Sequence, residues 1–455
     1  MRTWLAQLPN PISRWFPRDT HRTMPKPRII PRPEHTISRK HITPEALKVL
    51  YRLNDAGFEA YLVGGCVRDL LLNGQPKDFD VATNATPEEV HQLFRNSRIV
   101  GRRFRIAHVQ FGRTLIEVTT FRAGHDGAPN DTPHAVQSDA GMLLRDNVFG
   151  NIEEDALRRD FTINALYYSI RDFSLLDFTD GLKDLDARTL RIIGDPATRY
   201  REDPVRMLRA LRFAAKLDFK LSPETARPIV DLKPMLENIA PARLFDEILK
   251  LFMSGYGQKT WQQLCEYNVL PHLMPEAARA IANGPAWAGQ LVEQALINTD
   301  LRIAEDKPVT PAFLYASLLW PAVAARTAVL EKQLPPMDAY RQAASDVLHA
   351  QLKHITIPKR FSLPMREIWD MQFRLTRRTP RTAHSLLANP RFRAGYDFLL
   401  LRESAGEIAP GLGDWWTLFQ EANDSDKGNL LNTVKSPAPA KRSRRRRPRT
   451  RKPAP

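Results

Sequence analysis

The feature that most constrains this 455-residue chain is a pair of aspartates, Asp78 and Asp80, separated by one phenylalanine. In an extended segment successive side chains point to opposite faces, so both carboxylates would lie on one side and Phe79 in the core on the other. Two such carboxylates can hold hard divalent cations. A pair of ions about 3.5 to 4 Å apart can bind the attacking and the leaving oxygen of a phosphoryl transfer. Because an Asp-x-Asp pair alone is also typical of solvated turns, its surroundings decide the interpretation.

The residues before this pair favour nucleotide chemistry. Residues 61–63 have the pattern of a short apolar strand, Gly64-Gly65 that of a turn, and residues 67–72 that of a helix. Backbone N–H groups at the start of such a helix could face a phosphate. Arg68 follows the second glycine by three positions and precedes Asp78 by ten. Glycines, a cation and paired carboxylates in this order indicate chemistry at a nucleoside triphosphate.

This arrangement resembles the signature of the nucleotidyltransferase superfamily that includes DNA polymerase beta, in the bacterial branch of tRNA CCA-adding enzymes and poly(A) polymerases. Residues 158–165, Arg-Arg-Asp-Phe-Thr-Ile-Asn-Ala, are similar to a second motif of that branch. From the residues alone, an ion pair between Asp160 and an arginine is the alternative interpretation. The resemblance implies that Asp78 and Asp80 bind metal, that Asp160 is the third catalytic carboxylate, and that Gly64, Gly65, Arg68 and Arg159 bind the nucleotide.

A basic helix is predicted after the second motif, with Asp203 as its N-cap and Pro204 at its first position. At about 100° per residue, Arg206, Arg209 and Arg212 share an arc of roughly 120°, apart from an apolar stripe. A solvated basic face would have the same pattern. The segment is also similar to the Glu-Asp-x-x-Arg base-reading motif of the same branch. That resemblance implies that Asp203 and Arg206 read the incoming base and that Arg209 and Arg212 contact ATP.

Three strands are predicted between the two motifs, over residues 99–101, 106–111 and 114–121, which indicates a mixed sheet. Within the third strand, Glu117 lies on the opposite face from its apolar neighbours. It could reach the aspartates as a further carboxylate, or it could be an ordinary exposed strand residue. The pattern leaves both interpretations open.

The charge is concentrated at the two ends of the chain. Residues 435–455 contain ten basic residues and no acid, and residues 1–34 carry +5, so only +1 of the net +16 remains for the residues between. Segments of this composition cannot bury enough apolar surface to fold, so both ends are predicted to be disordered. The tail is either a solvated end or, as we expect, a contact for phosphate backbone.

The predicted fold class is α+β, with a mixed-sheet polymerase-beta-like nucleotidyltransferase head, an all-helical neck and C-terminal body, and a disordered basic tail. The helical patterns from residue 241 onward contain no Gly-rich phosphate loop. The expected divisions are a disordered arm at 1–34, the catalytic head at 35–195, the neck at 196–255, an RNA-binding body at 256–425 and the Arg-rich tail at 426–455.

Three segments resemble the poly(A) polymerases more than the CCA-adding enzymes, namely residues 35–53, 147–155 and 357–360. The resemblance implies a template-independent adenylyltransferase that adds AMP from ATP to RNA 3′ ends with two Mg²⁺ ions, in poly(A) tails that promote mRNA turnover. The alternative within the family is a tRNA CCA-adding enzyme. An alternative of a different class is a non-catalytic RNA-binding protein that has kept the fold.

Location and partners follow from the remaining patterns. The two cysteines, Cys66 and Cys265, have no metal-ligand spacing, so we expect reduced thiols in a cytoplasmic protein and no zinc site. No apolar run is expected to provide the roughly 20 residues of a membrane span. The expected partners are RNA 3′ ends, chiefly of mRNA and small RNAs, and RNA-decay proteins, and the expected state is a monomer.

Overall fold

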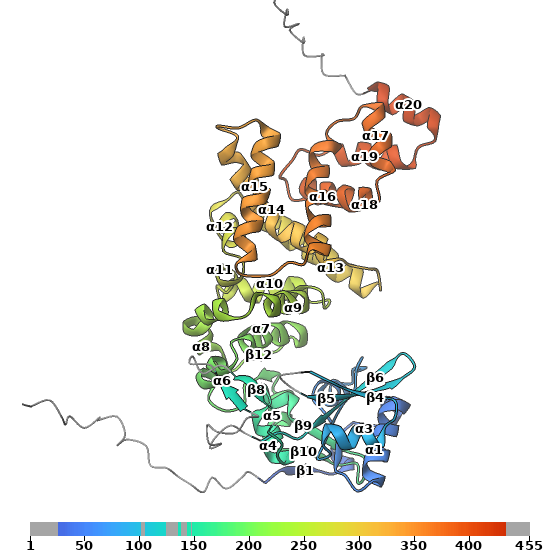
Figure 1. Ribbon diagram of the computed structural model, residues 1–455, viewed down its shortest axis with the longest axis vertical. Helices are drawn as coiled ribbons and strands as arrows, with labels where there is room; N and C mark the ends of the chain where they lie inside the picture. The colour runs from blue at the N-terminus through green and yellow to red at the C-terminus, as the bar shows by residue number, and fades with distance from the viewer. Residues whose placement is uncertain (1–25, 102–104, 124–134, 138–142, 147, 434–455) are drawn as a thin grey trace, which may run out of the picture. The chain divides into compact units, whose positions relative to one another are not determined.

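The computed structural model describes residues 26–101, 105–123, 135–137, 143–146 and 148–433 (Figure 1). The chain forms two compact units, residues 1–232 and 233–455. The boundary falls inside the predicted neck, whose first part therefore belongs to the unit that contains the sheet. The predicted α+β class is confirmed, because the strands of the main sheet all lie in the first unit and the described part of the second unit is helical.

An eight-stranded mixed sheet organises the first unit, in the order β1-β10-β9-β2-β3-β6-β5-β4. Among its described strands, β3 and β6 are parallel and the other neighbours are antiparallel. The strands are β1 (Arg28–Ile30), β2 (Ala60–Val63), β3 (Asp80–Thr83), β4 (Ser97–Val100), β5 (Ile106–Phe111), β6 (Thr114–Thr120), β9 (Leu166–Ser169) and β10 (Leu175–Asp177). A separate hairpin joins β7 (Ala135–Gln137) and β8 (Leu143–Asp146).

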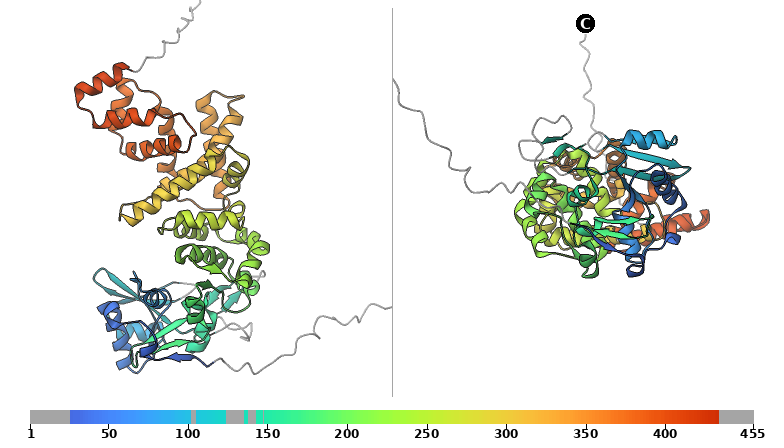
Figure 2. Two further views of the ribbon diagram at one scale, coloured as in Figure 1. Left: turned by 180° about the vertical axis from the view of Figure 1, so that it is seen from behind. Right: turned by 90° about the horizontal axis from the view of Figure 1, so that it is seen from below.

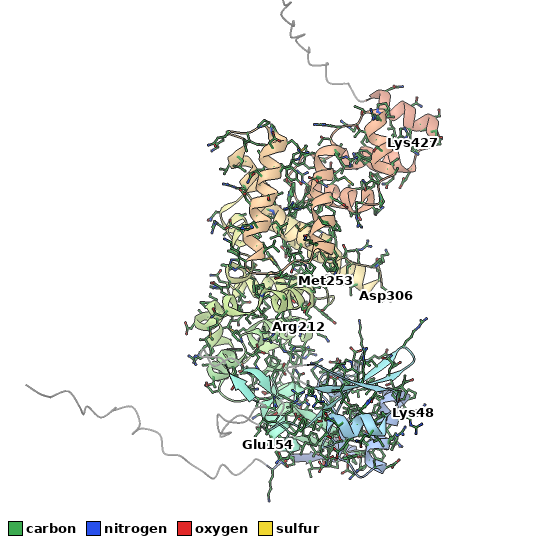
Figure 3. The ribbon with its side chains drawn as sticks, in the orientation of Figure 1. Lys48, Glu154, Arg212, Met253, Asp306 and Lys427 are labelled. Carbon is green, nitrogen blue, oxygen red and sulfur yellow. The ribbon has the colours of Figure 1, made fainter. Side chains whose placement is uncertain are left out.

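Helices α1 and α3 each begin with a proline that follows a threonine at the N-cap position. Thr86 and Glu89 form a complete capping box at the start of α3, with Pro87 at its first position. Gly57, at φ 90°, follows the end of α1. One side of α1 is buried against the sheet, whereas Lys48 lies on its exposed side (Figure 3). The helices of this unit are α1 (Pro44–Asp55), α2 (Gly65–Leu71), α3 (Pro87–Leu93), α4 (Ile152–Arg158), α5 (Gly181–Asp186), α6 (Pro196–Glu202), α7 (Val205–Leu217) and α8 (Pro223–Leu232).

Two sequence predictions need correction. The predicted disordered arm at 1–34 ends too late, because Arg28–Ile30 forms edge strand β1 and buries Ile30; prolines on both sides hid this strand. Outside the main sheet, β11 (Thr189–Leu190) pairs with β12 (Lys220–Leu221). The predicted tail at 426–455 begins too early, because α20 covers Asp424–Thr433. Residues 1–25 and the strongly basic segment 435–455 lie outside the described residues.

The second unit is a series of helices, seen from behind in Figure 2. By length and composition α14 could cross a membrane, contrary to expectation, and 56% of its apolar window is buried among its neighbours. It contacts α12, α13, α15 and α16, as the central helix of this unit. The helices are α9 (Pro241–Phe252), α10 (Gly257–Glu266), α11 (Leu270–Leu273), α12 (Pro275–Asn283), α13 (Trp287–Ala304), α14 (Pro311–Leu330), α15 (Pro336–Leu352), α16 (Lys359–Leu375), α17 (Pro380–Leu387), α18 (Phe392–Ser404), α19 (Leu412–Glu421) and α20.

Candidate active site

The aspartate pair lies at the start of β3, in the middle of the sheet. Phe79 is buried, as the alternation predicts, but the strand begins at Asp80, so Asp78 precedes it and is exposed. In the parallel pairing of β3 with β6, Asp80 lies in register with Glu117. Of the two interpretations that the sequence left open for Glu117, the structure supports the carboxylate beside the aspartates. Its side chain also remains 46% exposed.

The environment of Asp80 disfavours a negative charge. Burial, and then the neighbouring charges of Glu117 and Asp78, raise the pKa of Asp80 to about 6, although Arg159 acts in the opposite direction. A nearby cation would stabilise the charged form of a carboxylate whose pKa is raised in this way. The residues therefore fit a divalent metal ion, for which phosphate oxygens could complete the coordination shell.

Gly64 brings Asp80 and Arg159 to one place. Its backbone has φ 81°, a conformation that favours glycine, and it precedes the first turn of α2. A Cβ atom at this position would lie 3.8 Å from Arg159 Nη1 and 3.8 Å from Asp80 Oδ2. Gly65 opens α2, where a Cβ atom would meet only Arg68, at 3.5 Å. The first motif thus meets the second motif at Gly64, as nucleotide binding by both would require.

Arg159 is held in place by two residues that sequence reasoning missed. Its Nη2 donates to Asp155 Oδ2 at 2.9 Å, and its Nε donates to the Tyr167 hydroxyl at 2.9 Å. The Tyr167 hydroxyl in turn donates to Asp155 Oδ2 at 2.7 Å. The spacing of Asp155 and Arg159, four residues apart at the end of α4, is the signal that could have found this ion pair.

Asp160 is already paired within the protein. Arg209 donates to its Oδ2 from Nε at 2.9 Å and from Nη2 at 2.5 Å. Burial alone would raise the pKa of Asp160, but Arg209, Asn164 and the Phe161 N–H outweigh it and lower that pKa to about 2. The ion pair with an arginine, an alternative from the sequence, is present, and a catalytic role for Asp160 stays a prediction.

A chain of polar contacts joins the two motifs to α7. Arg68 is 2% exposed and donates to Asp69 at 2.6 Å and to the Asn164 side-chain oxygen at 2.8 Å. The Asn164 amide nitrogen donates in turn to Asp160 at 3.2 Å. Because both hydrogen-bonding sides of the Asn164 amide are used, it links the Arg68 of the first motif to the Asp160–Arg209 pair. The predicted contact of Arg68 with nucleotide stays a prediction.

Phe213 on α7 gathers three of the predicted nucleotide-binding arginines. The guanidinium carbons of Arg68, Arg209 and Arg212 lie 5.4, 5.2 and 4.6 Å from its ring centroid. Figure 3 labels Arg212 on this helix. The predicted apolar stripe of α7 is buried, and this burial fixes the orientation of the helix and therefore of its basic side. The basic side of the helix is therefore not simply solvated.

The predicted base-reading residues lie between α6 and α7. Asp203 ends α6 and accepts a hydrogen bond from the Val205 N–H at 3.3 Å, but the N-cap position of α7 belongs to Pro204, one residue later than predicted. The ion pair of Arg206 is with Glu202, at 2.7 Å. Base recognition by Asp203 and Arg206 is untested by these contacts and stays a prediction.

Further arginines crowd the same region. Burial, and then the like charges of four neighbouring arginines, lower the pKa of Arg158 to about 9. Burial and then Arg206 lower the pKa of Arg199 to about 10. A bound polyanion such as a triphosphate would offset the repulsion between these crowded arginines. The neighbours of Arg158 are Arg122, Arg199, Arg159 and Arg206.

Within the described ranges, no three His, Cys, Asp or Glu side chains are grouped closely enough to hold a metal ion by themselves. Metal binding at Asp78 and Asp80 would therefore rely on substrate oxygens for several ligands, which is how magnesium is usually held at phosphate sites.

Comparison with known proteins decides the family. A poly(A) polymerase I from Escherichia coli O6:H1 is 51% identical over 434 residues, which cover 94% of this chain and 93% of the relative. The chain belongs to the poly(A) polymerase I family. Three family descriptions match in order along it: "Poly A polymerase head domain" at 60–191, "Probable RNA and SrmB- binding site of polymerase A" at 218–281 and "Polymerase A arginine-rich C-terminus" at 332–452.

CCA-adding enzymes are more distant from this member of the poly(A) polymerase I family. One from Streptococcus suis is 39% identical over 232 residues, which cover 50% of this chain and 55% of the relative. A crystal structure of the Bacillus stearothermophilus CCA-adding enzyme in complex with CTP has a TM-score of 0.56 at 24% identity, covering 87% of this chain and 90% of that one. That likeness confirms the nucleotidyltransferase fold.

Proposed function

We propose that this protein is a polynucleotide adenylyltransferase that adds AMP from ATP to RNA 3′ ends without a template. Family membership over nearly the whole chain is what carries this conclusion. The local geometry agrees with it, because an electrostatically unsatisfied Asp80 and the cation of Arg159 flank Gly64. The CCA-adding alternative is disfavoured, since the likeness to such an enzyme in sequence covers only 50% of the chain.

The metal site is the first part of the proposal. Asp78 and Asp80 would hold two Mg²⁺ ions, and the register of β3 and β6 supports Glu117 as a further carboxylate near Asp80. When bound, the ions supply charge stabilisation at the attacking and the leaving oxygen. In the reaction the RNA 3′-oxygen loses its proton and bonds to the α-phosphorus, while the bond from that phosphorus to pyrophosphate breaks.

The nucleotide site is the second part of the proposal. Arg159, fixed by Asp155 and Tyr167, lies beside Gly64 where it can bind the phosphates. We keep Asp203 and Arg206 as the proposed readers of the base, because adenine offers an amino donor and a ring-nitrogen acceptor to a carboxylate and a guanidinium. Arg209 and Arg212 are supported as a basic face held around Phe213. Asp160 remains the proposed third catalytic carboxylate, and its ion pair with Arg209 joins it to this basic face.

The proposed partners are RNA 3′ ends, chiefly of mRNA and small RNAs. A match to a family described as a probable RNA-binding site supports RNA binding by residues 218–281. The segment 435–455, with ten basic residues and no acid, suits a salt-sensitive contact with the RNA backbone. We further propose that the protein is a cytoplasmic monomer and that it binds RNA-decay proteins.

The decisive experiment incubates the purified full chain with a labelled RNA of random sequence and each NTP separately, with magnesium. We expect an extended A tract with ATP and little addition from CTP, GTP or UTP. A tRNA without its terminal CCA is tested in parallel. Ordered addition of C, C and A to that tRNA, with no A tract on the random RNA, would replace this proposal with the CCA-adding alternative.

A further inference from the structure

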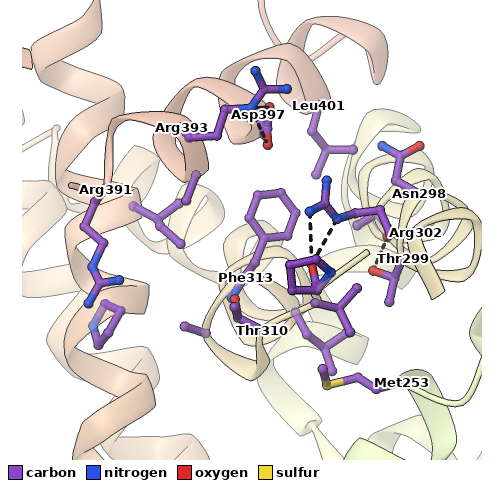
Figure 4. A pocket seen from close by; sticks show the side chains of 18 of the residues that line it. Met253, Asn298, Thr299, Arg302, Thr310, Phe313, Arg391, Arg393, Asp397 and Leu401 are labelled. Atoms are coloured by element: carbon purple, nitrogen blue, oxygen red, sulfur yellow. Dashed lines mark hydrogen bonds and ion pairs between the residues drawn. The ribbon is translucent and has the colours of Figure 1, made fainter. Parts of the chain in front are cut away.

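The helical unit contains a cavity of about 980 Å³ between α13, α14, α16 and α18 (Figure 4). This volume is in the upper range of sites that hold small ligands. Its walls include apolar side chains such as Phe313, Ile368 and Leu401, and the amides of Gln294 and Asn298. Ile368 and Leu401 are each 2% exposed, whereas Phe313 is only half-buried. The cavity thus combines an apolar floor with hydrogen-bonding side chains.

Four arginines surround this floor, and the structure fixes three of them by internal contacts. Arg302 donates to the Pro308 carbonyl at 3.0 Å, which joins the end of α13 to the loop before α14. Arg393 pairs with Asp397 at 3.0 Å. Figure 4 draws both contacts. Cations that are held in this way are oriented before any ligand arrives, which lowers the entropy cost of binding.

The other two arginines lie on the rim, where they are exposed to solvent, as is Arg393 with a side chain that is 71% exposed. Arg391 pairs with Glu367 at 3.0 Å, where both side chains are about half exposed. Arg360 lies 4.9 Å from the ring of Phe361, and among the described residues it has no carboxylate partner. A guanidinium over an aromatic ring is a surface on which a nucleobase can stack.

The segment that supplies this rim is strongly basic. Residues 359–393 contain nine Lys or Arg and two acidic residues, a net +7. By contrast, residues 35–434 together carry only +1. Of the nine basic residues, Arg360, Arg391 and Arg393 line the cavity. Such a concentration attracts a polyanion and makes its binding sensitive to salt.

We propose that this cavity binds an unpaired nucleotide of single-stranded RNA, with the base on the apolar floor against Phe313 and the backbone phosphates at Arg360 and Arg391. Stacking on an aromatic ring together with arginine–phosphate contact is the usual chemistry of single-strand binding. The amides of Gln294 and Asn298 can bond to base edges. The proposal rests on RNA being the substrate and extends RNA binding beyond the match at 218–281, because the cavity residues other than Met253 lie outside that match.

Direct binding of a fluorescent single-stranded RNA to the full chain, without ATP, tests the proposal. The double variant Arg360→Ala/Arg391→Ala removes two charges at the cavity. Its matched control, Arg374→Ala/Arg381→Ala, removes two exposed charges from the same basic segment, and neither residue lines the cavity. We expect about tenfold weaker binding for the cavity variant, and a salt slope lower by about 1.4 than that of the wild type. The control should change both quantities much less.

A third variant, Phe313→Leu, keeps most of the apolar volume and removes the ring. We expect about fivefold to tenfold weaker RNA binding with an unchanged salt slope. RNA that carries 5-iodouridine should also photo-crosslink to α14 near Phe313 in the wild type. Melting curves of all variants show whether each has kept its fold.

Several outcomes would overturn the proposal. Equal loss of affinity in the cavity variant and its control would mean that only overall charge matters. Crosslinks confined to residues outside the cavity would mean that RNA does not enter the cavity and that a protein segment occupies it instead. Loss of binding to free ATP, with RNA binding intact, would make it a mononucleotide site. Because none of these measurements requires AMP addition, failure of the proposed catalytic function would be seen separately, in the NTP assay.

Discussion

Asp80 and Asp160 are the same residue type in the same unit, yet their surroundings shift the pKa of the carboxyl group in opposite directions. Burial beside Glu117 and Asp78 raises the pKa of Asp80 to about 6. Arg209, Asn164 and a backbone N–H overcome burial and lower the pKa of Asp160 to about 2. An added cation would stabilise the charge of Asp80, whereas Asp160 already has Arg209 as its cationic partner.

This contrast separates two tasks that the sequence motifs do not distinguish. A group that is to bind a metal ion must not be neutralised beforehand by an arginine, because the arginine would compete with the metal. A group that holds a helix in place must be neutralised, because an unpaired buried charge is costly. Asp80 suits the first task and Asp160 the second. The predictions below test that division, beginning with the largest expected effect.

Replacing Asp80 with Asn should reduce AMP addition by about a thousandfold, ~4 kcal/mol of activation free energy, because the amide loses the charge that binds metal. Steady-state rates with saturating ATP, RNA and magnesium measure the effect. Asp186→Asn, at the exposed end of α5, is the matched control and should retain full activity. Near-normal turnover in Asp80→Asn would remove the metal site from β3.

Replacing Asp160 with Asn should destabilise the first unit by roughly 1 to 3 kcal/mol at pH 7, because the half-buried Arg209 would lose its carboxylate partner. The folded pKa of Asp160 is lowered, so its stabilising contribution is present above the unfolded pKa and is lost as pH falls towards about 2. Thermal denaturation at pH 7 measures the change. An unchanged melting temperature would show that the ion pair contributes little.

The Asp80→Asn variant should also be more stable than the wild type at pH 7.5, by up to about 3 kcal/mol in metal-free buffer. The folded pKa of Asp80 is raised, so ionisation costs stability as pH rises from its ordinary value of 3.8 through about 6. The difference between the two proteins should therefore vanish near pH 4. Denaturation at both pH values, in EDTA, checks the sign. A stabilising effect that persists at pH 4 would have some other cause than the charge of Asp80.

Replacing Glu117 with Gln should raise the free energy of unfolding by about 1 kcal/mol, the smallest of these effects. The change removes only one of the negative charges that repel the Asp80 carboxylate. The pKa of Asp80 should fall, and the acid limb of the activity profile should move to lower pH. Rates between pH 5 and 8 in wild type and variant test this shift, since a purely structural role would not move the profile. A limb at the same pH in both proteins would contradict a direct coupling of the two carboxylates.

Local patterns were enough to predict much of the fold. The buried position of Phe79 and the apolar stripe of α7 depend on neighbours a few residues away, and both predictions are confirmed. The boundaries at the ends of the chain were less predictable. Strand β1 is specified by its pairing with β10, and no pattern within its three residues reveals that pairing.

The candidate site shows the same limit. The residue types that carry charge could be found from the sequence, but their partners could not. Asn164 contacts Arg68 across 96 positions, and Arg209 contacts Asp160 across 49. The ring of Phe213 under three arginines is likewise visible only in three dimensions. Tertiary contacts therefore decided that Asp160 has an arginine partner.

The parallel register of β3 and β6 has a consequence for which changes the chain can accept over evolution. Side chains on a strand alternate, so moving β6 by one position would place Ile116 or Val118 beside Asp80 and turn Glu117 to the other face. A single-residue insertion or deletion between Phe111 and Glu117 would be more harmful than most substitutions there. We expect homologues to vary in composition along this hairpin while keeping its length constant.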